Sequence, residues 1–204
     1  MHNALSLFRE NIEESKSLTS LYEYLESSLV TPLSFDDLLR AQIVYSVSAF
    51  DKLMHDLIRI GMVEIFMGNR PTTPQYLAET ITISTYSDLI SATFLPKELV
   101  FEQAIVRKLK TVSYQTPDNV AKGLSYIWNE PQKWQKIASN MAMDTETVKT
   151  ELKLIVDQRN RIVHEADINP LTNQKYSITK SDCESATSFL KKTGEAIYTL
   201  VVSG

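Results

Sequence analysis

The chain has 204 residues, of which 43% are hydrophobic and 23% are charged, so its length fits one domain with a sizeable buried core. Only five glycines and seven prolines punctuate it, which disfavours turn-rich all-β folds and glycine-lined phosphate loops. A net charge of −4 argues against a protein that coats long nucleic acids through bulk basic charge, although a few arginines suffice to bind one phosphate.

The cysteine count, the spacing of the histidines and the length of the apolar runs limit the compartment and the kinds of site that we expect. The single Cys183 excludes an intrachain disulfide and a thiolate metal cluster. The three histidines are too dispersed for a metal site, and no phosphate-loop or dinucleotide fingerprint is present. The apolar run at 57–66 carries charges and is shorter than the roughly 20 residues of a membrane span. We therefore expect a cytoplasmic protein with no metal, no cofactor and no membrane partner.

Apolar residues at helical spacing predict two long helices in the N-terminal third, over residues 3–27 and 35–67. Ser34 is the expected N-cap of the second helix, and Gly68 is expected to follow its end. The apolar stripe of the second helix is continuous, so we expect this helix at the centre of the fold. The first stripe consists of Leu5, Phe8, Ile12, Leu18, Leu21 and Leu25, and the second of Leu39, Ile43, Val47, Phe50, Met54, Leu57 and Ile60.

Residues 70–142 are predicted to be a helical insertion into a simpler helical core. Residues 80–86 alternate like a short strand, but one isolated strand would be unstable, so we interpret them as loop or irregular helix. Short helices are predicted over 96–110, 118–128 and 131–142.

Two further long helices are predicted, over 144–166 and 179–202. Asp144 is the expected N-cap of the first, and residues 179–182 are expected to cap the second. The chain is therefore predicted to be all-α and a single domain over 1–204. We expect a bundle of long antiparallel helices, with the insertion between the second and third of them.

The densest cluster of functional chemistry lies at 157–167, near the end of the third long helix. Histidine has the only side chain whose unperturbed pKa lies near neutrality, so His164 is the candidate that moves a proton. Arg159 offers a fork of donors that matches phosphate oxygens. Asn160 lies four residues before His164, on the same helix face, where it can orient the imidazole or bind phosphate. These residue types suit RNA cleavage without a metal, which needs a proton carrier and a fixed cation.

The spacing of Arg159 and His164 constrains this hypothesis. Five residues correspond to roughly 140° around a straight helix, so the two side chains would not converge on one phosphate. Either the helix ends or distorts at Val163, or two copies of it meet about a two-fold axis and build a shared site. A different interpretation is also open, because Arg and His near a helix C-terminus interact favourably with the helix dipole in many unrelated proteins.

Residues 159–167 resemble the signature of HEPN domains, which are helical bundles with an Arg-x4–6-His motif. In this motif the residue directly after the Arg is commonly polar. Residues 39–56 resemble the central helix of the RiboL-PSP-HEPN subgroup. The similarity covers about 35–68 and 144–202. It implies a HEPN-type bundle that dimerises through the motif helices, with a metal-independent endoribonuclease activity. Arg159, Asn160 and His164 match the motif and are the candidate catalytic residues.

Several other residues are candidates for supporting roles. HEPN groups often place a polar or acidic residue on the central helix facing the site, and Asp51 matches best, with His55 one turn on. A solvent-facing i,i+4 pair is the alternative interpretation of these two residues. Within the cluster itself the remaining candidates are Asp157, Arg161 and Glu165.

Three functional hypotheses follow. The first is a homodimeric endoribonuclease that leaves 2′,3′-cyclic phosphate and 5′-hydroxyl ends, in a prokaryotic toxin–antitoxin, antiviral defence or RNA-repair system. The second is a non-catalytic HEPN module that binds RNA, a nucleotide or a protein partner such as a nucleotidyltransferase or an antitoxin. The third is a helical scaffold in which the motif only caps a helix and forms a dimer contact.

Overall fold

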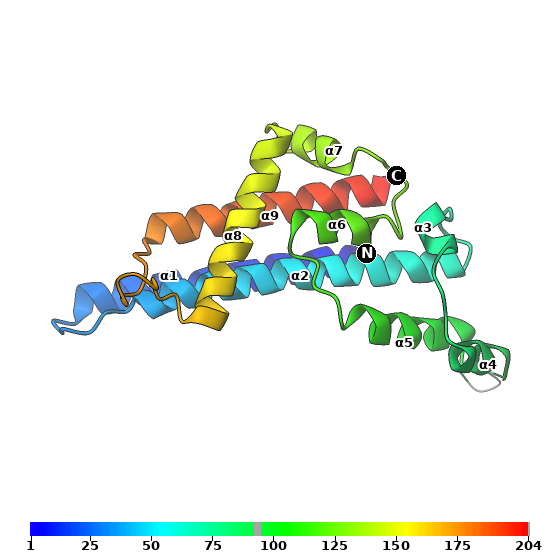
Figure 1. The fold of residues 1–204 in the computed structure, drawn as a ribbon, viewed down its shortest axis with the longest axis horizontal. Coiled ribbons are helices and arrows are strands. Elements are labelled where there is room, and N and C mark those ends of the chain that lie inside the picture. Colours follow the sequence, from blue (N-terminus) through cyan, green and yellow to red (C-terminus); the bar gives the residue numbers. More distant parts are fainter. Residues whose placement is uncertain (92–94, 204) are drawn as a thin grey trace.

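A computed structural model describes residues 1–91 and 95–203, and within these residues the fold is all-α, as predicted (Figure 1). The only strand-type pairing in the described part of the chain is a single bridge between Ile168 and Lys175. The helices are α1 (His2–Ser28), α2 (Asp36–Phe66), α3 (Pro74–Leu77), α4 (Ile83–Ser91), α5 (Lys97–Leu109), α6 (Pro117–Leu124), α7 (Lys133–Asn140), α8 (Thr145–Glu165) and α9 (Lys180–Ser203).

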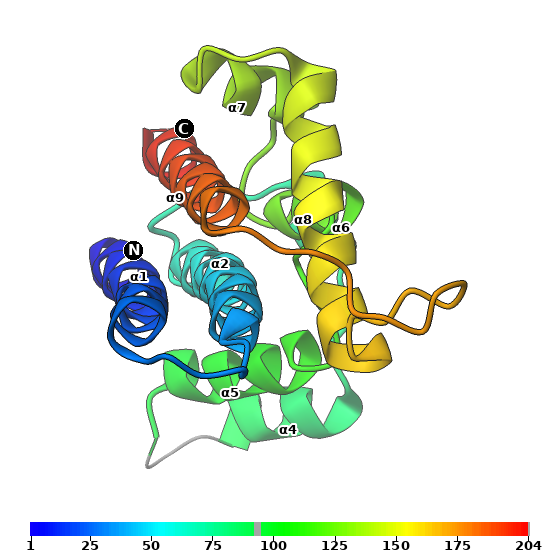
Figure 2. The same ribbon diagram turned by 90° about the vertical axis from the view of Figure 1, so that its left-hand side faces the viewer.

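Helix α2 lies at the centre of the fold, as its sequence predicts. It packs against α1 and α9 on one side and against α5 and α8 on others (Figures 1 and 2). Its predicted stripe from Leu39 to Leu57 is fully buried, and only Ile60 at the end of the stripe is partly exposed. Helix α9 approaches α1 and α2 closely because Gly194 has no Cβ. A Cβ added at this position would lie 2.6 Å from Phe8 and 2.9 Å from Leu53.

Helix α8 crosses the bundle steeply instead of running along it (Figures 1 and 2). Asp144 begins the helix as predicted, because its carboxylate accepts a hydrogen bond of 3.0 Å from the backbone N–H of Thr147. The first three turns bury Val148, Leu152 and Ile155 against the bundle. The last turns extend past the bundle, so the candidate motif lies at the edge of the molecule (Figure 1).

The other helix ends agree with their predicted signals except at the start of α2. Gly68 follows α2 with a φ of 76°, a left-handed conformation that glycine adopts without strain. Thr179 and Asp182 exchange side-chain and backbone hydrogen bonds and so cap α9. Ser34 was predicted as the N-cap of α2, but Phe35 occupies that position and makes no side-chain cap. The Ser34 hydroxyl accepts a hydrogen bond from the N–H of Asp36, the first residue of α2.

The helices of the insertion differ from the predicted ones: α6 and α7 are shorter than the predicted 118–128 and 131–142, whereas α3 and α4 were not predicted as regular helices. Residues 80–82 are irregular, but the rest of the alternating segment belongs to the regular helix α4, which Thr82 starts by accepting a hydrogen bond from the Thr85 N–H. The short helix α3 was not predicted, although Thr73 and Pro74 carry an N-terminal signal for it. Residues 92–94 of the predicted insertion lie outside the described residues.

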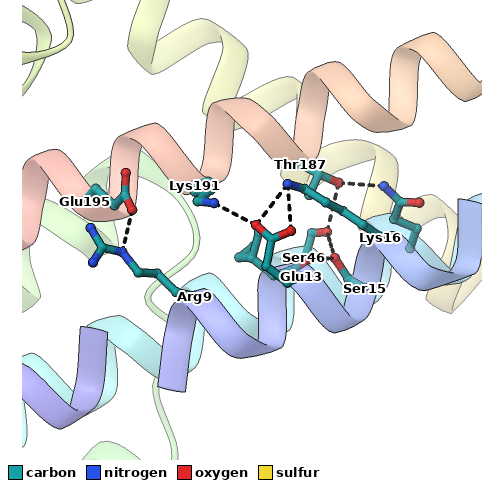
Figure 3. Close-up of polar contacts among 10 residues, drawn as sticks. Arg9, Glu13, Ser15, Lys16, Ser46, Thr187, Lys191 and Glu195 are labelled. Atoms are coloured by element: carbon teal, nitrogen blue, oxygen red, sulfur yellow. Dashed lines mark hydrogen bonds and ion pairs between the residues drawn. The ribbon is translucent and has the colours of Figure 1, made fainter. Parts of the chain in front are cut away.

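The second half of α1 differs from its predicted stripe. Leu5, Phe8 and Ile12 are buried, but beyond them Ser15 and Thr19 face the core, and Leu21 is exposed. These two hydroxyl groups join partners on α2 and α9 in a group that we call the interior polar cluster (Figure 3). It consists of Ser15, Thr19, Gln42, Ser46 and Thr187. None of the helices in the described residues is both long enough and apolar enough to cross a membrane.

Candidate functional site

The end of α8 is a regular helix that continues past Val163 to Glu165. Ala166 then turns the chain with a φ of 51°, and Asp167 follows with a φ of 57°. The two consecutive left-handed residues fold the chain back, so that Asp167 lies under the end of the helix instead of extending it. Of the two arrangements expected from the spacing of Arg159 and His164, the structure therefore excludes a helix that ends or distorts at Val163.

Arg159 and His164 point in different directions from this helix. Arg159 lies four residues after Ile155 and three after Val156, which are both buried, so it faces the bundle and is half-buried. His164 is rotated from it by roughly 140° and is exposed to solvent. One protomer by itself therefore does not bring the guanidinium and the imidazole onto the same side of α8.

Asn160 contacts Arg159 and lies on the same side of α8 as His164. Its side-chain Oδ1 accepts a hydrogen bond of 3.1 Å from Nη1 of Arg159. Its own position, four residues before His164, is on the imidazole's side of the helix. The bond fixes the orientation of the amide, because Oδ1 is occupied by the arginine and the Nδ2 group is left to donate elsewhere.

A buried ion pair fixes the end of α8 to the start of α2. Asp167 is 2% exposed and its Oδ2 accepts a hydrogen bond of 2.9 Å from Nε of Arg40, whose side chain is 6% exposed. A second nitrogen of Arg40, Nη2, donates to the backbone carbonyl of Tyr176 at 2.6 Å. The backbone N–H of Tyr176 donates in turn to the carbonyl of Asp167 at 2.9 Å. We call Arg40, Asp167 and Tyr176 the α8 anchor.

Arg161 lies against this anchor. Its Nε is 3.7 Å from the second carboxylate oxygen of Asp167, Oδ1, which is within ion-pair range but too long for a hydrogen bond. Its guanidinium carbon lies 5.1 Å from the centre of the Tyr176 ring, in the range of a cation–π contact. Arg161 is thus held by two contacts even though its side chain remains 38% exposed.

Three buried polar atoms of the described residues lack a hydrogen-bond partner. They are Nε of Arg159, Nε of Arg161 and Oδ1 of Asp167. Buried polar groups in proteins are nearly always paired, so these atoms call for an explanation. Nε of Arg161 and Oδ1 of Asp167 face each other at 3.7 Å, whereas Arg159 lies on the side of α8 that faces the bundle.

The predicted supporting residues lie in two different environments. Asp51 on α2 accepts hydrogen bonds from the Tyr114 N–H at 2.7 Å and from the Gln115 amide at 3.0 Å, so it fixes the segment before α6. His55 forms the expected i,i+4 pair with Asp51 at 3.7 Å, but both side chains are half-buried instead of facing solvent. Asp157 and Glu165 are exposed on α8.

Hydrogen bonds and ion pairs of Asp51 and His55 within the described residues do not reach Arg159, Asn160 or His164. His55 instead packs edge-on against the ring of Tyr114, with ring centres 4.9 Å apart. Burial raises the pKa of that tyrosine to about 12, with smaller contributions from nearby acidic groups that include Asp51. The structure therefore gives Asp51 and His55 partners in the insertion.

Sequence reasoning did not identify Arg40 or Tyr176 as part of this site. The one available signal was a charged residue inside the otherwise apolar stripe of α2, three residues after Asp37, with which Arg40 pairs at 3.2 Å. Nothing local indicates the partner, because Asp167 is 127 residues away in the sequence. The described residues contain no group of three or more His, Cys, Asp or Glu side chains arranged to hold a metal ion.

Comparison with protein-family models gives a match over most of the chain. A protein-family model described as RiboL-PSP-HEPN matches residues 9–203, which include all of α2, α8 and α9. Neither the curated proteins nor the solved structures yield a significant match to the chain.

Proposed function

This chain belongs to the RiboL-PSP-HEPN family, and from that premise we propose that it is a homodimeric, metal-independent endoribonuclease. HEPN domains are in general ribonucleases or nucleotide-binding modules. The observation that carries the catalytic proposal is the pair of Arg159 and Asn160, which a hydrogen bond of 3.1 Å joins one turn before the exposed His164 on α8. Neither the Nδ2 group of Asn160 nor the imidazole of His164 makes a hydrogen bond within the described residues, so both remain available for a substrate.

The chemistry assigned to these residues is cleavage by the RNA's own 2′-hydroxyl. His164 accepts the proton from this hydroxyl as the bond between O2′ and phosphorus forms. The bond between phosphorus and O5′ then breaks and the 5′-oxygen takes the proton that His164 carries, which leaves a 2′,3′-cyclic phosphate and a 5′-hydroxyl and restores the neutral imidazole. Arg159 stabilises the charge on the phosphorane oxygens, and Asn160, through its free Nδ2 group, donates to phosphate or imidazole.

A two-fold dimer supplies the geometry that one protomer lacks. Val163 projects from α8 between the directions of Arg159 and His164, and this apolar side chain is 45% exposed. A second copy packed on this surface would bring its own His164 toward Arg159 of the first. Because a two-fold contact is self-complementary, it would build two such sites at once.

The proposal is tested by incubating the purified protein with a mixture of RNAs in the presence of EDTA. We expect cleavage whose products carry 2′,3′-cyclic phosphate and 5′-hydroxyl ends. His164→Ala and Arg159→Ala should each reduce the rate at least about 100-fold, since each removes a group that acts in the transition state. His2→Ala, which removes an exposed histidine on α1, serves as the matched control and should leave the rate unchanged. Intact RNA with the wild-type dimer would contradict the proposal.

Mixing the two inactive variants tests whether the site is shared. A dimer of one Arg159→Ala copy and one His164→Ala copy contains one site with both residues intact and one with neither. Random assortment would then restore about a quarter of the wild-type rate. A site built within one protomer predicts no restoration. RNA binding without cleavage, both in the wild type and in the variants, would favour the non-catalytic module that binds RNA, a nucleotide or a protein partner.

A further inference from the structure

A second guanidinium shares the face of α8 that carries His164. Arg161 precedes His164 by three residues, so the two positions are separated by roughly 60° around the helix, with Asn160 on the other flank. Residues three or four apart are neighbours on a helix surface, with Cβ atoms about 5–6 Å apart. Within one protomer it is therefore Arg161, and not Arg159, that presents a guanidinium next to the imidazole.

The contacts of Arg161 orient its guanidinium with its outer edge towards solvent. Nε is buried beside Oδ1 of Asp167, and the Tyr176 ring covers one face of the group. Nη1 and Nη2 make no hydrogen bond within the described residues and are not among their buried unpartnered atoms, so both donors are accessible. An exposed arginine ordinarily loses side-chain entropy when it binds a ligand, but a restrained one has less to lose.

We propose that Arg161 is a substrate-binding residue whose Nη1 and Nη2 hold a backbone phosphate of single-stranded RNA adjacent to the phosphate that reacts. This inference rests on the proposed function, because it takes RNA as the ligand of this face. The two terminal nitrogens of a guanidinium match two oxygens of one phosphate, which a lysine ammonium cannot do. Arg161 thereby fixes the register of the strand over His164, while Arg159 serves the reacting phosphate.

A purely structural role for Arg161 is disfavoured by the anchor itself. Oδ2 of Asp167 already accepts a hydrogen bond of 2.9 Å from Arg40, whereas Nε of Arg161 stays 3.7 Å from Oδ1. The backbone carbonyl of Tyr176 is likewise bound by Arg40. Both hydrogen bonds that Arg40 makes in the α8 anchor are therefore independent of Arg161, whose contact with the Asp167 carboxylate is the longer one to Oδ1.

The test measures RNA binding as a function of salt concentration in the His164→Ala background, which cannot cleave the probe. The probe is a fluorescein-labelled, randomised single-stranded RNA. Adding Arg161→Gln should weaken binding roughly tenfold at low salt, because a charge-assisted contact is lost. It should also flatten the dependence of log K on log salt by about 0.7 for each Arg161 that contacts a phosphate. A loss of folding alone would not change this slope in the surviving folded fraction.

Two variants of Tyr176 test whether its ring positions the Arg161 guanidinium, since they leave the charge of Arg161 unchanged. Tyr176→Phe keeps the ring under Arg161 and should bind RNA like its parent, whereas Tyr176→Leu should weaken binding with an unchanged salt slope. Lys136→Gln on α7, at the other end of α8, removes the same charge far from the motif and is the matched control (Figure 1). An Arg161→Gln slope equal to that of the parent, or equal losses in Lys136→Gln, would overturn the inference.

This outcome is distinguishable from a failure of the proposed function. If the wild type binds RNA without cleaving it, and Arg161→Gln still flattens the salt slope, the phosphate contact stands and the catalytic proposal falls. If the wild type cleaves RNA and Arg161→Gln does not change the salt slope, the catalytic proposal stands and the phosphate contact of Arg161 falls. Absence of any salt-dependent binding in the His164→Ala parent overturns the role of Arg161.

Discussion

Two polar regions of the molecule can be compared directly, because both lie where helices pack and both contain several hydrogen-bonding side chains. In the interior polar cluster, the hydroxyls of Ser15 and Ser46 are 3.0 Å apart, as are those of Ser46 and Thr187, and the Gln42 amide also donates to Thr187 at 3.0 Å (Figure 3). At the end of α8, three buried polar atoms lack any such partner within the described residues.

The comparison teaches that the density of polar groups does not by itself indicate function. The interior polar cluster satisfies its own donors and acceptors across three helices, so it specifies how α1, α2 and α9 fit together. At the end of α8, Nε of Arg161 and Oδ1 of Asp167 lie 3.7 Å apart without a hydrogen bond, and the outer nitrogens of Arg161 make none within the described residues. We therefore assign the first region to stability and the second to ligand binding, and the following predictions test that division.

The largest expected effect on stability comes from Arg40→Ala. This change leaves Asp167 as a buried carboxylate without its main partner, which costs about 3–5 kcal/mol of the free energy of unfolding. Urea unfolding followed by circular dichroism measures the loss. Arg161→Gln is the matched control and should change stability by less than about 0.5 kcal/mol, because its contact is longer and partly exposed. Equal losses in both variants would make Arg161 a structural part of the anchor.

Thr187→Val should lower the free energy of unfolding by about 1–3 kcal/mol. The substitution keeps the shape of the side chain but removes the oxygen to which Gln42 and Ser46 bond in the core. Thr199→Val on the same helix removes an exposed hydroxyl and should have little effect. The rate of RNA cleavage per folded molecule should be unchanged in both, and a change in Thr187→Val would connect the interior polar cluster to the site.

Alkaline pH should destabilise the protein through a buried thiol and two buried phenols. Burial is the main cause that raises the pKa of the Cys183 thiol and of the phenols of Tyr114 and Tyr126 to about 12 in the folded state. Each group ionises at lower pH when unfolded, so its contribution is complete below the unfolded pKa and disappears as pH rises towards 12.

For Cys183, whose unfolded pKa is about 8.5, this corresponds to a loss of about 1 kcal/mol at pH 9.5. Stability measured by urea unfolding from pH 7 to 10 should therefore decline in the wild type and decline less in Cys183→Ala. An identical decline in the two proteins would show that the thiol already ionises in the folded state.

The smallest effect is expected for the ion pair between Arg9 on α1 and Glu195 on α9, which lies outside the interior polar cluster (Figure 3). Both side chains are partly exposed, so the attraction is screened by solvent and Arg9→Ala should cost no more than about 0.5 kcal/mol. Thermal unfolding at low and high salt measures it. A loss as large as that of Thr187→Val would remove the distinction between buried and surface contacts on this face.

Much of the fold could be predicted from the sequence, because the four long helices carry their own periodic patterns and end signals. The buried stripe of α2 and the N-cap of α8 at Asp144 follow from such local rules. Ser15 and Thr19 were not predicted to face the core, since their burial depends on partners in α2 and α9. Helix α3 was missed although Thr73 and Pro74 carry its N-terminal signal, and α4 was obscured because the alternation of residues 80–86 is typical of a strand.

The candidate site was predictable from the sequence to a similar extent, for its local features only. The residues of the motif and the angular separation of Arg159 from His164 were visible in the sequence, because both depend only on helical spacing. The α8 anchor was not, because its three residues come from α2 and from either side of a surface loop. The hydrogen bond from Arg159 to Asn160 was likewise unforeseen, since adjacent residues on a helix do not ordinarily face each other.

The ion pair of Arg40 with Asp167 also has a consequence for the order of folding. It joins residues 127 apart, and the bond from Arg40 to the Tyr176 carbonyl spans 136. Contacts of such sequence separation form only after a large loop has closed, whereas α1 and α2 meet through a short connection. We therefore expect α1 and α2 to pair early in refolding, and the surface around His164 and Arg161 to acquire its shape among the last parts of the molecule.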